Sequence, residues 1–188
     1  MVMSLRFYLA FLALLASERV AELVLSARHA RRLLSRGAVE AGRGHYPAMV
    51  AFHALFLLAC VAGAFAHPGV PAPWALLALA GALAAQVVRW WVIGTLGERW
   101  STRVIVPCDE PPVTAGPYRF VRHPNYLAVA LEMACVPLAY GLWQVALAFS
   151  LGNAALLMVR IRAEERALGA QWARVFRDRP RFLPGGRS

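Results

Sequence analysis

The sequence predicts an all-α integral membrane protein with about five transmembrane helices and additional amphipathic helices on the cytoplasmic side. Of the 188 residues, 60% are hydrophobic, and they gather in runs about as long as a bilayer is thick. Soluble proteins of this length rarely contain such runs. The arginines lie mostly between the runs, in segments that would face water. We therefore expect residues 1–188 to form a single membrane-embedded domain.

The apolar runs predict five spans that are joined by short turns or by polar segments. They are residues 5–24, 46–66, 74–93, 124–140 and 142–159, and a cytoplasmic tail follows at 160–188. The first run lacks a basic leader, and charges interrupt it where a signal peptide would be cleaved, so we expect it to remain as a helix. Among these charges, Glu18 and Glu22 share one helix face. They either pair with Arg19 at the membrane interface, which is the simpler interpretation, or line a polar cavity inside the bundle.

The composition of the connecting segments predicts their structure. Residues 27–45 carry five arginines and suggest a short helix that lies along the membrane surface. The uncharged, proline-rich residues 67–73 are expected to form a turn. Residues 94–122 are polar and contain too many prolines for a long helix. In the second span, His53 stands alone among apolar residues, and such a histidine is usually a packed, hydrogen-bonded residue.

A short basic motif precedes the fourth span. Pro124 fits the first turn of a helix, so this helix is expected to begin at His123 or Pro124. Its start would present free backbone N–H groups beside Arg119, Arg122 and His123, which suits an anionic ligand. The alternative is a basic turn that binds lipid headgroups at the interface. The fourth and fifth spans are short and meet at Gly141, which predicts a helical hairpin.

The distribution of arginine predicts how the chain crosses the membrane. Residues 27–45, 94–123 and 160–188 hold 17 of the 20 arginines, whereas the connections at the other ends of the spans hold none. By the positive-inside rule, the three arginine-rich segments face the cytoplasm and the amino terminus faces outward. The formal charge of +10 then favours anionic lipids as partners over nucleic acid. The three cysteines are widely spaced and predict neither a disulfide framework nor a metal site.

Polar residues within the last two spans predict a site. Glu132 lies seven residues after Asn125 and therefore on the same helix face. Asn153, Arg160 and Glu164 follow one face of the next helix. Because a buried charge is costly in lipid, we expect these groups to face a cavity or one another. A pair that only fixes helix packing, and a solvated, self-paired face at the start of the tail, remain alternatives.

Two motifs, taken together, resemble the isoprenylcysteine carboxyl methyltransferase family. The first is Gly-Pro-Tyr-Arg-Phe-Val-Arg-His-Pro-Asn-Tyr at 116–126, and the second is Arg-x-x-x-Glu-Glu at 160–165, after an apolar hairpin. The resemblance covers about residues 96–168, and the double motif at this spacing is specific, whereas Arg-His-Pro alone is not. Members of this family are membrane-embedded enzymes that use S-adenosylmethionine, and relatives methylate phospholipid headgroups. Membrane sterol reductases share a similar segment but are much longer chains with more spans.

The resemblance implies that the bundle itself binds S-adenosyl-L-methionine and releases S-adenosyl-L-homocysteine. No Gly-x-Gly-x-x-Gly motif of a soluble cofactor domain follows a strand, and no metal is implied. Arg160, Glu164 and Glu165 would bind the amino-acid end of the cofactor, and the tyrosine, histidine and proline of the first motif would hold the adenosyl part. The implied cofactor-binding residues are Gly116, Tyr118, Arg122, His123, Pro124, Tyr126, Glu164 and Glu165.

The amino-terminal half resembles a bacterial branch of this family. The stretch from Ser26 to His45-Tyr-Pro, followed by an apolar span, is similar to membrane methyltransferases found beside type III polyketide synthases. Those enzymes act on alkylresorcinols or alkylpyrones. The resemblance therefore implies a phenolic lipid or alkylpyrone that enters from the bilayer, and a place in the bacterial inner membrane. A prenylcysteine-type carboxyl or phospholipid methyltransferase is the alternative, and a non-enzymatic transporter subunit or scaffold is the rival class.

The chemistry of the methyl acceptor decides whether the enzyme needs a base. A carboxylate is already ionised at neutral pH, whereas a phenol has a pKa near ~10 and gains from removal of its proton. Glu132 or Glu164 is the candidate base, and Glu132 is preferred because it lies on the lipid side of the expected pocket. These two glutamates and Arg160 are the expected catalytic residues.

Overall fold

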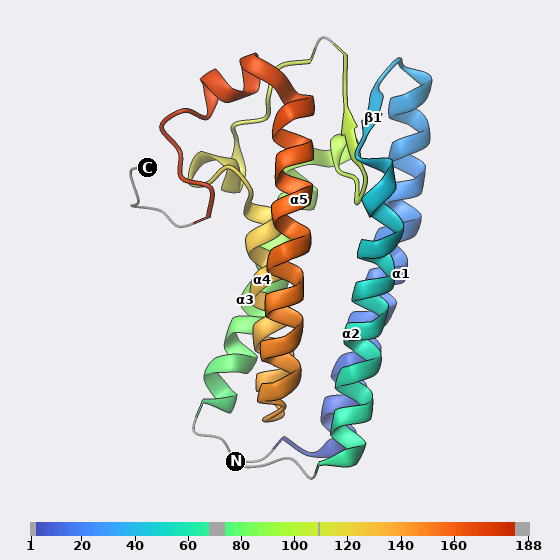
Figure 1. Ribbon diagram of the computed structural model, residues 1–188, viewed down its shortest axis with the longest axis vertical. Helices are drawn as coiled ribbons and strands as arrows, with labels where there is room; N and C mark the ends of the chain where they lie inside the picture. The colour runs from blue at the N-terminus through green and yellow to red at the C-terminus, as the bar shows by residue number, and fades with distance from the viewer. Residues whose placement is uncertain (1–2, 68–73, 109, 183–188) are drawn as a thin grey trace.

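The described part of the chain folds into five helices that run alternately up and down (Figure 1). The computed structural model describes residues 3–67, 74–108 and 110–182. The helices are α1 (Leu5–Ser35), α2 (Tyr46–Ala66), α3 (Ala75–Leu96), α4 (Pro124–Leu138) and α5 (Trp143–Val175). The predicted all-α membrane fold is confirmed, and α4 begins at Pro124 as expected.

Three helical segments of the described residues are long and apolar enough to cross a membrane. They are Arg43–Ala66, Ala75–Arg99 and Trp143–Val175. Helix α4 is apolar but shorter, and α1 is long but carries three charged residues close together, Glu18, Arg19 and Glu22. For α1 and α4 the crossing of the membrane therefore stays a prediction, although the alternating direction of the helices is the one that five spans require (Figure 1).

Helix α1 differs from the expected span followed by a separate surface helix within residues 27–45. It is one continuous helix of 31 residues, capped by the Ser4 hydroxyl, which accepts a hydrogen bond from the Phe7 N–H at 3.3 Å. The surface-helix prediction was wrong because the buried face of α1 continues through Ser26 and His29 at helical spacing. This second half of α1 packs on the bundle and binds the loop that carries Trp100 and Thr102.

A short antiparallel ribbon, which was not predicted, joins the loops that follow α1 and α3. Strand β1 (Val39–Ala41) pairs with β2 (Val104–Val106), with Glu40 opposite Ile105. Glu40 also accepts a charged hydrogen bond from Arg43 at 2.9 Å. The ribbon therefore fixes the start of the polar segment between α3 and α4 against α1.

The arginine-rich segments gather at one end of the bundle, here called the basic end (residues 27–45, 97–123 and 160–182). Figure 1 shows them together at the top, with the amino terminus and the turn between α4 and α5 at the bottom. The chain thus places the segments that carry its two motifs at the same end, as the distribution of arginine predicts.

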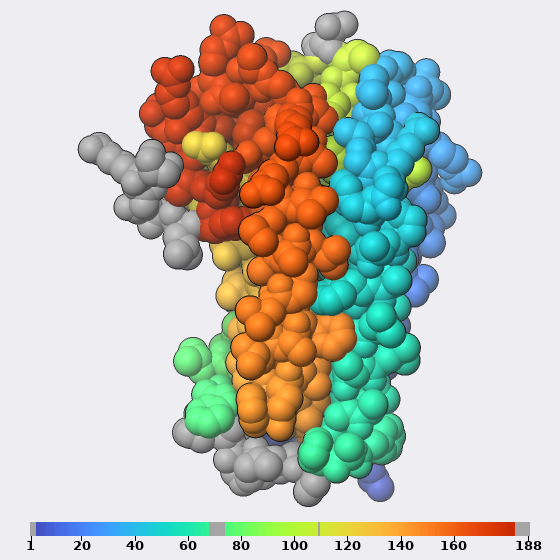
Figure 2. Space-filling view, viewed as in Figure 1, coloured from blue at the N-terminus to red at the C-terminus, as the bar shows by residue number. Residues whose placement is uncertain are grey.

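The helices pack tightly at the end opposite the basic end. There the rings of Tyr8 and Tyr140 stack with centroids 4.5 Å apart. A Cβ at Gly81 would lie 2.7 Å from the Cys135 Sγ, so a larger residue there would have to displace the Cys135 side chain or separate α3 from α4. Figure 2 shows α2 and α5 in contact along the visible face. This packing holds the bundle together below the site.

Helix α5 breaks sharply at Gly169. Its φ of 72° and ψ of −166° belong to a region that is open almost exclusively to glycine. The last part of the helix therefore turns away from the bundle axis (Figure 1), and Trp172 and Phe176 stack with centroids 4.8 Å apart. The tail was predicted to be helical to about Phe176, which is confirmed, but the break was not predicted.

Candidate active site

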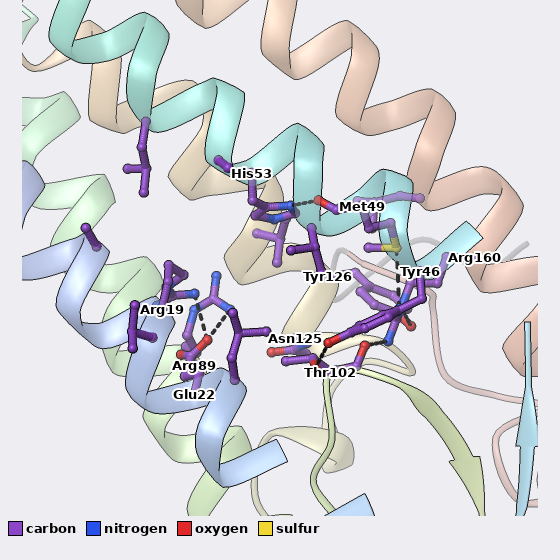
Figure 3. Close-up of a pocket in the computed structure, with 18 of the residues that line it drawn as sticks. Arg19, Glu22, Tyr46, Met49, His53, Arg89, Thr102, Asn125, Tyr126 and Arg160 are labelled. Atoms are coloured by element: carbon purple, nitrogen blue, oxygen red, sulfur yellow. Dashed lines mark hydrogen bonds and ion pairs between the residues drawn. The ribbon is translucent and has the colours of Figure 1, made fainter. Parts of the chain in front are cut away.

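Two adjoining cavities lie toward the basic end. The helix cavity has a volume of about 290 Å³, lies among α1–α5 and is lined mainly by apolar side chains (Figure 3). The loop cavity has a volume of about 100 Å³ and lies between the end of α3, β2, the 3-10 helix η3 (Gly116–Arg119), the start of α4 and the last turns of α5. Four residues line both cavities: Trp100, Asn125, Tyr126 and Arg160.

The boundary between the cavities is a hydrogen-bonded group centred on Tyr126. Its hydroxyl accepts a hydrogen bond from the Arg160 Nε at 2.7 Å and donates one to the Glu164 carboxylate. Arg160 donates a second bond to the Thr102 carbonyl at 2.6 Å. Its remaining terminal nitrogen contacts only the Met49 sulfur, at 3.3 Å, which is a weak acceptor. This terminal nitrogen of the Arg160 guanidinium is therefore available to a ligand that offers a stronger hydrogen-bond acceptor than the thioether.

Two polar atoms at this boundary lack partners among the described residues. The Asn125 Oδ1 and the Trp100 Nε1 are both buried and make no hydrogen bond to the protein. A buried donor or acceptor without a partner costs free energy, so such atoms usually have a ligand or water. Both belong to residues that line the two cavities, which is where a bound molecule would satisfy them.

The second half of α1 positions the loop that carries Trp100 and Thr102. The Ser26 hydroxyl accepts a hydrogen bond from the Thr102 N–H at 2.9 Å. The His29 ring donates through Nδ1 to the Trp100 carbonyl at 2.8 Å, since a carbonyl can only accept. This explains why α1 extends beyond the apolar run, and sequence reasoning missed these two residues.

Aromatic rings form one wall of the loop cavity. The His123 ring stacks on Tyr126 with centroids 5.3 Å apart and lies 5.5 Å from the Trp172 ring, which the break at Gly169 brings back toward α4. Tyr118 lies on the same cavity. Burial, helped by the Glu164 carboxylate, raises the pKa of the Tyr118 hydroxyl.

The structure brings His123 and Glu164 to the same cavity, as the double motif implies, but it places Glu165 elsewhere. Glu165 accepts hydrogen bonds from the His123 Nε2 at 3.1 Å and from Arg181 at 2.8 Å. It does not line either cavity. Its carboxylate orients the His123 ring and holds the tail, and its expected contact with the cofactor stays a prediction.

Arg122 and its neighbour bind the tail instead of presenting free N–H groups to an anion. The backbone N–H groups of Arg122 and His123 donate to the carbonyls of Pro180 and Arg181, at 2.9 and 3.2 Å. The Arg122 side chain reaches the Arg179 carbonyl at 2.5 Å. The backbone N–H groups of these two residues are therefore not free, and although Arg122 lines the loop cavity, its role in binding an anion stays a prediction.

Gly116 and Pro124 shape the site without lining it. Gly116 has a φ of +55°, and a Cβ there would lie 2.2 Å from the Thr95 Oγ1, so η3 approaches α3 too closely for a larger residue. Pro124 is buried in the first turn of α4. Gly116 positions Tyr118, and Pro124 positions His123, but neither residue lines the loop cavity.

Glu132 lies in a buried ion pair and not on either cavity. Its carboxylate is 2.6 Å from the Arg89 guanidinium and 3.2 Å from the Gln86 amide, and the residue is 2% exposed. Asn153 is also buried and also lies off both cavities. Of the two polar helix faces that were expected to meet, Asn125 of α4 and Arg160 and Glu164 of α5 therefore line the cavities, whereas Glu132 and Asn153 do not.

The charged residues of α1 divide between the two interpretations that the sequence left open. Glu22 lines the helix cavity with Arg19 and Arg89, at 3.0 and 3.6 Å from their guanidinium groups, and its Oε1 has no partner in the described residues. Glu18 instead accepts a hydrogen bond from the Trp90 indole at 2.5 Å. Glu22 therefore lines a cavity, as one interpretation predicted, and both glutamates pair with Arg19, Glu18 at 3.3 Å, as the other predicted.

His53 lines the helix cavity, although its solitary position in an apolar run predicted only a packed residue. Tyr46, Met49 and His53 are spaced three and four residues apart and share the inner face of α2 (Figure 3). That spacing is the signal that sequence reasoning passed over. The prediction that His53 is hydrogen-bonded is confirmed, since its Nδ1 lies 2.8 Å from the Met49 carbonyl.

Comparison with known proteins gives a consistent assignment. The model of the Isoprenylcysteine carboxyl methyltransferase (ICMT) family matches residues 76–170, a range that contains both motifs and every residue that lines the loop cavity except Trp172. "Uncharacterized protein YpbQ" of Bacillus subtilis is 38% identical over 157 residues, which cover 84% of this chain and 94% of that protein. An "Uncharacterized protein" of Haemophilus influenzae is 26% identical over 151 residues, 80% of this chain and 88% of its own. The chain belongs to the isoprenylcysteine carboxyl methyltransferase family of membrane methyltransferases.

Proposed function

We propose that this protein is an S-adenosylmethionine-dependent O-methyltransferase that acts on a lipophilic molecule with a phenolic or enolic hydroxyl. The observation that carries the proposal is the pair of adjoining cavities, one polar and aromatic, the other largely apolar, which meet at Tyr126 and Arg160. Methyl transfer requires the attacking oxygen, the methyl carbon and the sulfur to lie in line. Two compartments with a shared boundary provide that arrangement.

The loop cavity is the proposed donor site. S-adenosylmethionine supplies an activated methyl group on a sulfonium, and its positive charges suit the Glu164 carboxylate and the aromatic faces of Tyr118, His123 and Trp172. The unpartnered Asn125 Oδ1 at the boundary adds a polar atom for this ligand. Arg160 offers a guanidinium to a carboxylate.

The size of the loop cavity implies movement on cofactor binding. Ligands of this size occupy several hundred Å³, whereas the cavity has about 100 Å³. The tail at residues 177–182 lies against the start of α4. It is held there by backbone carbonyls that accept hydrogen bonds from Arg122 and His123. We propose that the tail shifts outward when the cofactor enters.

The helix cavity is the proposed acceptor site. Val20 on α1 and Val50 and Ala54 on α2 line the cavity and are also exposed on the outside of the bundle, Val20 to 62%. The cavity therefore reaches the apolar surface between α1 and α2. An acceptor can place its polar head at the boundary with Tyr126 while its tail stays among lipid chains.

A carboxylate acceptor, as in a prenylcysteine-type carboxyl methyltransferase, is the second candidate. It is favoured by the Arg160 nitrogen that has only the Met49 sulfur as a partner, since a carboxylate would be a far better acceptor. A non-enzymatic transporter subunit or scaffold would leave the buried, unpartnered atoms at the boundary without a purpose. We further propose that the basic end faces the cytoplasm of a bacterial inner membrane and contacts anionic lipids.

The proposal is tested first by cofactor binding. Glu164→Gln and His123→Ala are expected to weaken the affinity for S-adenosylhomocysteine in detergent by about 10- to 100-fold. The first variant loses a charged partner of the ligand, and the second loses an aromatic ring from the wall of the loop cavity. Titration calorimetry measures this. Glu98→Gln is the matched control, since Glu98 pairs with Arg32 on the exposed surface at 2.7 Å, outside both cavities.

The outcomes separate the rival functions. Wild-type protein that binds S-adenosylhomocysteine and not NADPH supports a methyltransferase over a reductase. Transfer of labelled methyl from S-adenosylmethionine to an alkylresorcinol, compared with a farnesylated cysteine, then separates a hydroxyl acceptor from a carboxylate. Unchanged affinity in Glu164→Gln and His123→Ala would remove the loop cavity as the donor site, and no binding by wild type would contradict the function itself.

A further inference from the structure

His53 is an ionisable residue in the helix cavity that the proposed function does not yet use. Figure 3 shows it on the inner side of α2, facing the cavity that it shares with Asn125, Tyr126 and Arg160. Its position is fixed by the hydrogen bond between its Nδ1 and the Met49 carbonyl, 2.8 Å apart. The side chain is thus held in one orientation within the proposed acceptor site.

The hydrogen bond to Met49 determines which ring nitrogen of His53 carries the proton. A carbonyl oxygen only accepts, so Nδ1 must donate and is protonated. In the neutral ring, the Nε2 then has a free lone pair. A histidine with its Nδ1–H held by an acceptor and its Nε2 unprotonated has the arrangement of a general base.

The carboxylates near the cavity are less suited to accept a proton. Glu132 is bound to Arg89 at 2.6 Å and lies off the cavity, and Glu164 accepts the hydroxyl of Tyr126. Glu22 reaches the cavity but lies within 3.6 Å of two guanidinium groups, which compensate its charge. The charged groups that face the space around His53 from the other helices are Arg19 and Glu22 of α1, Arg89 of α3 and Arg160 of α5. Among these, only Glu22 is a rival base.

We propose that His53 is the general base of methyl transfer and that the acceptor is therefore a weakly acidic hydroxyl rather than a carboxylate. The acceptor O–H bond breaks and its proton passes to Nε2 as the oxygen forms its bond to the methyl carbon. The bond from that carbon to sulfur breaks and its electron pair stays on sulfur. The imidazolium then loses its proton to water. This inference rests on the proposed function, adds a catalytic residue to the same site and gives a reason to prefer the hydroxyl acceptor over the carboxylate.

The test replaces His53 without removing its bond to the backbone. In His53→Asn the side-chain amide can still donate to the Met49 carbonyl, but it has no basic nitrogen. With pentadecylresorcinol as acceptor, we expect kcat to fall by roughly 100-fold, the size of effect typical of a lost general base. KM and the affinity for S-adenosylhomocysteine are expected to stay within about a factor of three. A role in packing alone would instead change these two values.

A more acidic acceptor gives the distinguishing readout. Ring-nitrated pentadecylresorcinol is largely ionised at neutral pH and needs no base, so His53→Asn and wild type are expected to methylate it at similar rates. Glu22→Gln is the matched control and is expected to slow both acceptors equally. If Glu22→Gln and not His53→Asn shows the selective loss, Glu22 is the base and the inference is overturned.

The remaining outcomes separate this inference from the proposed function. If wild type methylates the resorcinol and His53→Asn does so at the full rate, the role of His53 as general base is contradicted and the proposed function is not. Wild type that methylates only a farnesylated cysteine, at the same rate in His53→Asn, contradicts the hydroxyl acceptor and the base together. Wild type that binds no S-adenosylhomocysteine and transfers no methyl group contradicts the proposed function, and the base with it.

Discussion

Buried polar side chains in this bundle serve either the site or the packing, and their partners distinguish the two. Arg160 keeps one nitrogen with only a thioether partner and lies on both cavities, so it is available to ligands. Glu132 has strong partners in Arg89 and Gln86 and faces no cavity. The same residue types thus have different roles, and only the contacts reveal which.

Glu132→Gln is expected to destabilise the protein without selecting between acceptors. It leaves Arg89 buried with a weaker partner, and breaking a buried ion pair typically costs about 3–5 kcal/mol. Thermal unfolding in detergent should show a clear fall in Tm. The remaining folded protein should lose phenol and carboxylate methylation in equal proportion. A loss confined to the phenol would instead make Glu132 the base.

The double variant Arg89→Met with Glu132→Leu provides the control for this ion pair. Removing both members of the pair leaves neither Arg89 nor Glu132 as an uncompensated charge, although the Gln86 amide loses its acceptor, and well-packed apolar replacements of a buried pair are often neutral in stability. We expect the double variant to be more stable than Glu132→Gln. Arg19 and Glu22 remain paired at 3.0 Å in either case.

At the scale of elements, the site depends on a few segments with unusual backbone geometry. The break at Gly169 turns the end of α5 so that Trp172 reaches His123. The α1 extension and the β1–β2 ribbon hold the loop that carries Trp100. These elements together position the residues that line the loop cavity.

Gly169→Ala tests the role of the break. An alanine in this region of φ and ψ costs about 1–3 kcal/mol in backbone strain, so the end of α5 should straighten or fray. We expect weaker binding of S-adenosylhomocysteine by titration calorimetry, because Trp172 leaves the wall of the loop cavity. Ala170→Gly, the matched control beside it, costs about 0.5–1 kcal/mol but forbids no conformation, and should bind normally. Normal binding by Gly169→Ala would show that Trp172 is dispensable.

At the scale of the whole molecule, apolar length and arginine placement predicted the five helices of the bundle, except for the extension of α1 to Ser35, together with their alternating direction and the shared basic end. The double motif predicted that His123 and Glu164 meet at one cavity, which the contacts of Tyr126 explain. These features follow from local composition and from motifs along the chain, so the sequence was sufficient for them.

The parts that the sequence did not predict depend on contacts between distant segments. The tail accepts hydrogen bonds from the N–H groups of Arg122 and His123, and it follows a helix end that the break at Gly169 redirects. Glu132 looked like a site residue because helix spacing cannot show that Arg89, from another helix, lies 2.6 Å away. His53 was passed over for the same reason, since nothing near it in the sequence shows the cavity that it faces.

The most direct measurement is a structure of the protein with S-adenosylhomocysteine bound. We expect the ligand in the loop cavity, with its amino-acid end near Glu164, its adenosyl part against the His123 and Trp172 rings, and its sulfur directed toward Tyr126 and the helix cavity. The tail should be displaced from Arg122. Ligand found outside the loop cavity, or with its sulfur directed away from Tyr126, would contradict the proposed meeting of donor and acceptor at this boundary.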